Sequence, residues 1–301
     1  MTELPLGVSQ PIVKLKRRTK PPADSPLGWI DAMSYGILIL GSLAFLLPIL
    51  FLFTGSLQSH STSIAGRLHL IPNEWMVSNY PAAAAEMHFT RSLANTIFIT
   101  ALTMLGQIIS GSLVGFGFAR FKFPGRDALF LIMLATLMLP AQVTIIPQFL
   151  LFRSLGWVNS FLPLIVPAWF GAPFFIFLFR QAFLQIPDEL IEAARLDGAS
   201  WWKIYYRLIL PLCKPVITVV AIYSFLAAWN DYLNPLVYLN DPSHATLALA
   251  LASFKGEYGV TRPEYLLAAT ALTMLPCLVL FSLTQRLLVR SADAEASGTL
   301  P

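Results

Sequence analysis

The chain has 301 residues, of which 56% are hydrophobic and 12% are charged, and its formal net charge is +4. Soluble domains carry about 25% charged residues, so this composition excludes a water-soluble fold and indicates a polytopic membrane protein. The small excess of positive charge gives little support for nucleic-acid binding.

The chain begins with a segment, residues 1–30, that is rich in proline and basic residues, and we expect it to be a loose cytoplasmic tail. The first apolar run follows at residues 35–53. A signal peptide is the alternative interpretation, but its apolar region spans about 7–15 residues, whereas this run is longer and lacks a convincing cleavage site. We therefore interpret it as an uncleaved first transmembrane span.

Five more runs follow that are long enough to cross a bilayer, whose core takes roughly 20 helical residues. They lie between Arg91 and Arg120 and at residues 128–152, 154–179, 215–237 and 265–285. Such continuous runs do not show the alternation of a transmembrane barrel, and the prolines within them are tolerated in a membrane bundle. The sequence therefore predicts an all-α polytopic membrane protein. We expect six transmembrane helices over residues 31–290, followed by a polar cytoplasmic tail over residues 291–301.

The second run contains residues with small side chains. They are Gly106, Ser110, Gly111, Gly115 and Gly117. Small residues let the backbones of two membrane helices approach closely, so we expect this helix to pack tightly against its neighbours.

Basic residues are distributed unevenly between the two sides of the membrane. Fifteen of the 20 lie in the N-terminal tail, in residues 119–126, in residues 180–214 and at the end of the last run. The other five are Arg67, Arg91, Arg153, Lys255 and Arg262. Because basic residues are enriched on the cytoplasmic side, we expect both termini and residues 180–214 in the cytoplasm, and residues 58–90 and 240–264 outside.

The sequence contains no catalytic or cofactor-binding motif that we can identify. It has no phosphate-binding loop of the form G-x-x-x-x-G-K-[ST], no H-E-x-x-H and no C-x-x-C. The four histidines are scattered over the expected outer side, and we interpret them as polar surface residues rather than metal ligands. Cys213 and Cys277 have no evident partner and are interpreted as small apolar residues.

A few polar residues interrupt the apolar runs. Asn230, Asp231 and Asn234 lie in "AAWNDYLNPL", which we expect to continue the fifth helix. Intramembrane ionisable groups usually face a pathway or the interior of the bundle, but an interfacial helix end anchored by Trp229 and Tyr232 explains this stretch equally well. Asn95 and Gln142 are weaker pathway candidates, as are Gln107 and Thr144, because hydrogen bonds between helices also account for them.

Residues 180–214 form a loop long enough to have structure of its own. Asp188 suits the start of a short helix that Gly198 ends in a left-handed conformation. Ser200 can cap a second helix with apolar residues at helical spacing. These residues are Trp201, Ile204, Tyr205, Leu208 and Ile209. Pro211 and Pro215 then mark the transition to the fifth span.

The first of these helices, residues 188–196, is shorter than the 12–15 residues at which isolated helices become even marginally stable. It therefore needs another surface, and Ala193 and Ala194 leave a face on which such a surface can approach closely. Glu192 and Asp197 offer charges for pairing. The alternative is a helix lying on the membrane and anchored by Trp201 and Trp202, which does not explain the small-residue face.

The pattern of this loop resembles the cytoplasmic coupling signature of binding-protein-dependent ABC importer permeases. The matching residues are Glu192, Ala193, Ala194, Asp197, Gly198, Ala199, Leu210 and Pro211. The extended form "EAARLDGAS" looks like the carbohydrate branch, specifically the smaller six-helix subunit of maltose-type importers. The similarity extends over residues 27–290 and includes "GFGFARFKFPGR" and "AAWNDYLNPL"; Leu208, where the signature usually has isoleucine, is a conservative departure.

The resemblance implies a type I permease fold and a division of labour. Two permease subunits would form the pathway and two cytoplasmic ATPases would bind ATP and Mg. An external solute-binding protein would deliver a sugar, so this chain would bind no cofactor and would catalyse no reaction itself. The first short helix would sit in a cleft on an ATPase, with Glu192 paired to a basic residue there. The chain would lie in a bacterial or archaeal cytoplasmic membrane.

Three other functions stay open at this stage. A permease for amino acids or peptides would have the same general pattern. An ion-driven secondary transporter would be expected to show repeated halves with broken helices, and no clear repeat is visible. A membrane-embedded enzyme would need acids or histidines clustered at one face, and the sequence shows no such cluster.

Overall fold

A computed structural model describes residues 29–60, 72, 74–256, 259–260 and 262–296. The expected N-terminal tail, except its last two residues, lies outside the described residues. The chain divides into two compact units, Met1–Ile49 and Leu50–Pro301, and the boundary falls inside the first helix.

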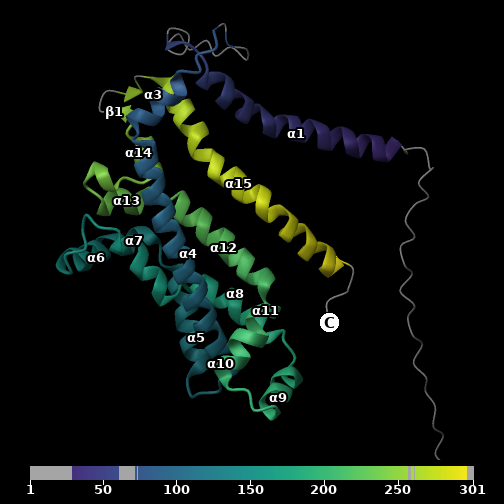
Figure 1. Cartoon of the computed structure of the whole chain (residues 1–301). Helices are drawn as coiled ribbons and strands as arrows, with labels where there is room; N and C mark the ends of the chain where they lie inside the picture. Colours follow the sequence, from purple (N-terminus) through teal and green to yellow (C-terminus); the bar gives the residue numbers. More distant parts are fainter. Residues whose placement is uncertain (1–28, 61–71, 73, 257–258, 261, 297–301) are drawn as a thin grey trace, which may run out of the picture. The chain divides into compact units, whose positions relative to one another are not determined.

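The described chain is almost entirely helical, as predicted, and Figure 1 labels its elements. The long helices and those that bound the functional segments are α1 (Trp29–Ser56), α3 (Asn79–Glu86), α4 (Phe89–Arg120), α5 (Arg126–Ala135), α6 (Ala141–Ser154), α8 (Pro173–Leu184), α9 (Asp188–Leu196), α12 (Lys214–Trp229) and α15 (Pro263–Ala296). Shorter helical turns are η1 (Thr136–Met138), α7 (Leu162–Ile165), η2 (Val166–Phe170), α10 (Trp201–Ile204), the π-helical turn η3 (Tyr205–Ile209), α11 (Leu210–Leu212), α13 (Leu233–Tyr238), η4 (Pro242–His244) and α14 (Leu247–Ala252). A small antiparallel pair, β1 (Lys255–Gly256) and β2 (Gly259–Val260), pairs Lys255 with Val260.

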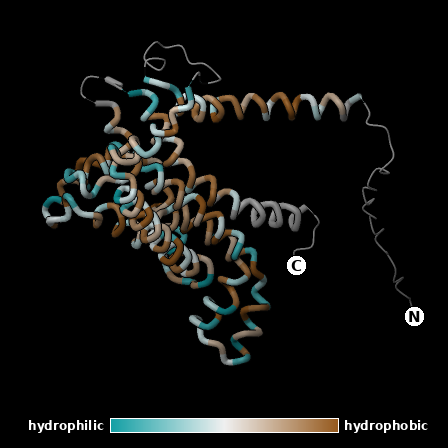
Figure 2. Tube along the Cα trace, turned by 45° about the horizontal axis from the view of Figure 1, so that its top comes forward, coloured by the Kyte–Doolittle hydropathy of each residue, from teal (hydrophilic) through white to brown (hydrophobic). Residues whose placement is uncertain are grey.

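Among the described residues, three stretches are long and apolar enough to cross a membrane: Ala32–Ser56, Phe89–Arg120 and Leu162–Leu184. The number rises to as many as five if each of two bent helix pairs forms one span. The last predicted run lies on α15, whose apolar part, Pro263–Val279, is shorter. All six predicted runs are therefore found on helical segments. Figure 2 shows that hydrophobic residues follow the helices while hydrophilic residues gather mainly in the connecting segments.

The prediction of one continuous helix is wrong for the third, fourth and fifth runs. In the fourth, residues 155–161 form turns, and Gly171 (φ 86°, ψ 131°) separates η2 from α8. The third bends by 100° between Arg126–Met138 and Ala141–Ser154. Pro140 follows Leu139, whose backbone is extended (ψ 119°), because the residue before a proline is disfavoured in the α conformation. The fifth run stops as a helix at Trp229 and resumes at Leu233. In a continuous helix Pro235 could not donate to the carbonyl of Asp231 and its ring would clash with it.

Helix α4 is the centre of the unit formed by residues 50–301, where it packs against α8, α12 and η2. At its start, a buried cluster joins α3, α14 and α15 and includes Met87, Trp229 and Leu247. At its end, a second cluster joins α8 to the 188–213 segment. Figure 1 shows α3 and α14 at one end of α4 and α9 and α10 at the other.

The small residues of α4 explain its close packing on α8 and η2, with one exception. A Cβ atom placed on Gly115 would lie 2.8 Å from the Cβ of Phe179 and 3.2 Å from the backbone carbonyl of Ile176. Ser110 Oγ donates to the carbonyl of Ala168 at 3.1 Å. Gly117 does not take part, because no atom lies within 4 Å of the position that its Cβ would occupy.

Candidate functional site

The short helix α9 begins and ends where the sequence predicts. Asp188 and Glu189 occupy its first turn and Arg195 its last, so their charges complement the helix dipole. Gly198 follows at φ +76°, a conformation that glycine adopts without steric cost. The chain can therefore reverse direction between the two helices of this loop.

Most of the surface of α9 is not covered by the rest of the chain. Ile191 is its one buried residue, and Ala194 packs half-buried against the cluster at the end of α4. Glu192, Ala193 and Asp197 are exposed, and Leu196 is 89% exposed. An isolated helix of this length is not stable in water. Because the rest of the chain leaves most of α9 uncovered, its exposed side is suited to docking on another protein.

The second helix of the loop is built into the body of the protein. Ser200 Oγ accepts a hydrogen bond from the backbone N–H of Lys203 at 3.4 Å, which confirms the predicted cap. The predicted apolar face is also confirmed, because Ile204, Tyr205 and Ile209 are buried, and Trp201 packs on Phe121 at 5.0 Å between ring centroids. Of the predicted signature residues beyond α9, Ala199 and Leu210 pack against the same cluster, while Pro211 is exposed just before the bend into α12.

Helix α4 contacts this loop through residues that the sequence did not single out. Ser112 Oγ and the hydroxyl of Tyr205 lie 2.7 Å apart. The buried guanidinium of Arg120 pairs with Asp188, at the start of α9. The sequence showed Arg120 only as one basic residue in a positively charged loop, because its partners lie 63–68 positions away.

Two cavities in the bundle share a set of polar lining residues, Thr103, Gln107, Asp231 and Asn234. Their volumes are about 320 and 230 Å³. Asp231 accepts hydrogen bonds from the backbone N–H of Asn234 at 3.2 Å and from its Nδ2 at 2.8 Å. Asp231 is thus bonded to the first turn of α13, and both residues are among those that the sequence placed on a pathway.

Gln107, a weaker pathway candidate, lines both cavities together with Asp231 and Asn234, whereas Asn95, Asn230 and Gln142 line neither. Asn95 Nδ2 donates to the carbonyls of Ser243 and Ala245, each at 3.0 Å, and so ties α4 to the segment before α14. Asn230 is exposed, bonds back to the carbonyl of Leu226, and lines a different cavity. Gln142 is exposed on α6, outside the two shared cavities. Their roles on a pathway stay predictions.

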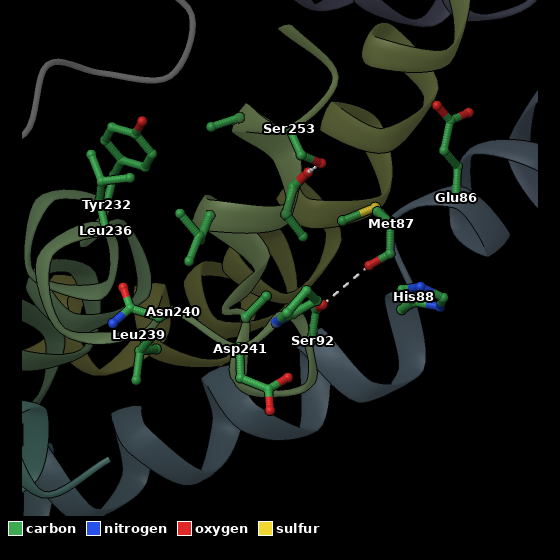
Figure 3. A pocket seen from close by; sticks show the side chains of 15 residues that line it. Glu86, Met87, His88, Ser92, Tyr232, Leu236, Leu239, Asn240, Asp241 and Ser253 are labelled. Carbon is green, nitrogen blue, oxygen red and sulfur yellow. Dashed lines mark hydrogen bonds between the residues drawn. The ribbon is translucent and has the colours of Figure 1, made fainter. Parts of the chain in front are cut away.

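A further cavity of about 370 Å³ lies near the start of α4, on the side predicted to be outside (Figure 3). Its lining comes from the α3–α4 junction, α13 and α14, and Ser92 Oγ donates to the carbonyl of Met87 at 3.1 Å. His88 has a positive φ of 47° at this junction. A hydrogen bond from the backbone N–H of Ser243 lowers the pKa of the Asp241 carboxyl.

Residues 107–293 match the family described as "Binding-protein-dependent transport system inner membrane component". The chain is 32% identical over 276 residues to the arabinooligosaccharides transport system permease protein AraQ of Halalkalibacterium halodurans, covering 90% of this chain and 95% of that protein. It is 33% identical to the sn-glycerol-3-phosphate transport system permease protein UgpE of Pectobacterium atrosepticum (88% and 97% covered). It is 29% identical to the diacetylchitobiose uptake system permease protein NgcG of Streptomyces coelicolor (89% and 88% covered).

Solved structures show the same fold. A bacterial ABC transporter involved in the import of the acidic polysaccharide alginate aligns with a TM-score of 0.76 at 24% identity, covering 88% of this chain and 99% of that one. A methionine ABC transporter, MetNI, aligns with a TM-score of 0.51 at 19% identity, covering 67% and 94%. The family match, the relatives and the shared fold agree, and the chain belongs to the inner membrane components of binding-protein-dependent transport systems, as a transport permease subunit and not an enzyme.

Proposed function

We propose that this chain is one permease subunit of an ATP-driven ABC importer that carries a sugar or related carbohydrate into the cytoplasm. The observation that carries the proposal is α9, a helix too short to be stable alone, on which Glu192 and Ala193 are exposed, as is Asp197 directly after it. The names of the relatives support the carbohydrate class, since two of them are permeases for oligosaccharides or an amino-sugar disaccharide.

The partners follow from the same division of labour. A second permease subunit completes the pathway, two ATPase subunits bind ATP and Mg, and an external solute-binding protein delivers the substrate. The absence of a phosphate-binding loop from the sequence supports placing ATP on other subunits. We assign the coupling role to residues 180–214 and orient them toward the cytoplasm, together with both termini.

For the substrate, we propose a path past Asp231 and Asn234, with Gln107 and Thr103 on α4 opposite them in the lining of the shared cavities. Hydroxyl groups of a sugar can donate to the carboxylate and amide oxygens and accept from the amide N–H groups. Amino acids or peptides are the second candidate class. Binding of candidate ligands to the cognate solute-binding protein distinguishes the two classes directly.

The test is transport by the complete complex in vesicles. We expect ATP-driven sugar uptake that depends on the binding protein, and no ATP hydrolysis by the purified chain alone. Glu192→Ala is expected to weaken docking of the ATPases and reduce uptake, while Glu86→Ala, which changes an exposed glutamate at the end of α3, is the matched control. Robust hydrolysis by the isolated chain, free of contaminating ATPase, would contradict the proposal.

A further inference from the structure

The side chain of Arg120, the last residue of α4, is 6% exposed and reaches three acceptors across the start of the coupling loop. Its Nη2 donates to the carbonyl oxygens of Phe183 and, at 2.7 Å, of Ile186. Its Nη1 donates to Oδ1 of Asp188, which is 81% exposed. Because the donors of a guanidinium point in fixed directions, this one group fixes how the chain turns from α8 into α9.

Only two apolar contacts hold α9 in place besides Arg120, within the described residues. Its contact with the buried cluster comes from Ile191 and Ala194, its fourth and seventh residues. Pro187 precedes it and has no N–H to donate. The bond to Arg120 therefore places the first turn of α9 relative to α4, although the chain connects α9 to α8.

Helix α4 also packs against the residues that follow α9, and it contributes to the lining of the shared cavities. Phe116 packs against Phe183, Trp201 and Tyr205, with ring centroids 5.2–6.4 Å apart. On the same helix, Gln107 lines both cavities; at 1.5 Å per residue it lies about 20 Å from Arg120. One element thus contacts both short helices and the polar lining around Asp231.

The covalent route from the loop to these cavities is less direct. It passes through the π-helical turn η3 and a bend of 78° between Trp201–Leu212 and Lys214–Trp229. Bends and helix breaks are where side chains and backbone can absorb movement. Helix α4 spans Phe89–Arg120 as one helix without an internal proline, so it is the route that contains no break.

We propose that Arg120 is a positioning residue that ties α9 to α4, so that α4 carries movement of α9 to the cavities around Asp231 and Asn234. This inference rests on the proposed function of α9 as the ATPase-docking helix. It assigns the transmission to a helix that precedes the coupling loop in the sequence rather than to the span that follows it.

The experiment uses the complete complex in vesicles and measures sugar transported per ATP hydrolysed, with assembly checked by co-purification of the ATPases. Arg120→Met is expected to lower this ratio at least about tenfold, equivalent to a coupling free energy of about 1.4 kcal/mol. Arg120→Lys, which keeps the charge but not the forked geometry, should restore part of the ratio. Arg126→Met is the matched control. Arg126 is the first residue of α5, six positions after Arg120, and donates to its neighbour Asp127, so its replacement should leave the ratio unchanged.

A second variant keeps the proposal testable if Arg120→Met fails to assemble. Asp188→Asn changes an exposed carboxylate and leaves the guanidinium with its carbonyl partners, so the complex should assemble, and the ratio should fall by a smaller factor. A wild-type ratio in Asp188→Asn and in any assembled Arg120→Met complex would overturn the proposal, as would loss of uptake and hydrolysis in equal proportion. Failure of the wild-type complex to take up sugar would instead count against the proposed function.

Discussion

Gly198 is a position at which the backbone, not the packing, limits the choice of residue. Its φ is +76°, and apart from its own chain neighbours no described residue comes within 4 Å of the place that a Cβ would occupy. A β-branched residue is a genuine outlier at such a φ, whereas asparagine tolerates it. We expect Gly198→Val to cost about 1–3 kcal/mol of local strain and to displace α10 relative to α9.

The consequence should be a complex that inserts in the membrane but transports poorly. Sugar uptake and ATPase activity in vesicles, with expression checked separately, measure this. Gly198→Asn is the control, since it adds a side chain of comparable size without the same backbone strain, and it should retain most of the uptake. Equal activity of the two variants would show that the turn at Gly198 does not position α10 relative to α9.

At the scale of elements, the contact between α4 and α8 depends on the absence of a side chain at Gly115. A methyl group there would meet backbone atoms, with the N of Arg180 and the carbonyl oxygen of Ile176 each at 3.2 Å. A flexible side chain could change rotamer to avoid the methyl group, but these backbone atoms cannot, so α4 and α8 must move apart. We expect Gly115→Ala to destabilise the protein by about 1–3 kcal/mol, as overpacked cores do.

Gly117 provides a control two residues further along the same helix. Its Cβ position is free of contacts within 4 Å, and replacing a helical glycine by alanine is intrinsically favourable by about 1 kcal/mol. Thermal unfolding of the purified complex in detergent should therefore show a lower transition temperature for Gly115→Ala and an unchanged or higher one for Gly117→Ala. The reverse order would contradict the packing.

Local signals in the sequence were sufficient for the loop that contains α9. The helix boundaries at Asp188 and Leu196, the turn at Gly198 and the cap at Ser200 all depend on residues close in sequence, and the structure confirms them. The break after Trp229 was missed because hydropathy alone does not register Pro235 as a helix breaker inside an apolar run. Arg120 was missed for a different reason, since its acceptors lie more than 60 positions away, on α8, on α9 and between them.

In the unit formed by residues 50–301, described segments that are predicted on opposite sides of the membrane lie at opposite ends of α4. Its first residue, Phe89, packs against the cluster that contains Met87 and Leu247, and its last, Arg120, bonds to the start of α9. The described segments at the two ends of α4 are therefore the same ones that the distribution of basic residues assigns to opposite sides of the membrane. From the charge asymmetry, we assign the end that carries α9 to the cytoplasm.

The orientation can be tested by labelling single cysteines in intact cells, after Cys213 and Cys277 are replaced by alanine. We expect Ser200→Cys, exposed next to α10, to be protected from a membrane-impermeant reagent until the cells are opened. Thr90→Cys, exposed in the first turn of α4, should react from outside. Fifteen of the 20 basic residues lie on the side assigned to the cytoplasm, and moving them outside would oppose the bias that sets orientation. Labelling of Ser200→Cys from outside, with Thr90→Cys protected, would invert the topology and place α9 where no ATPase can reach it.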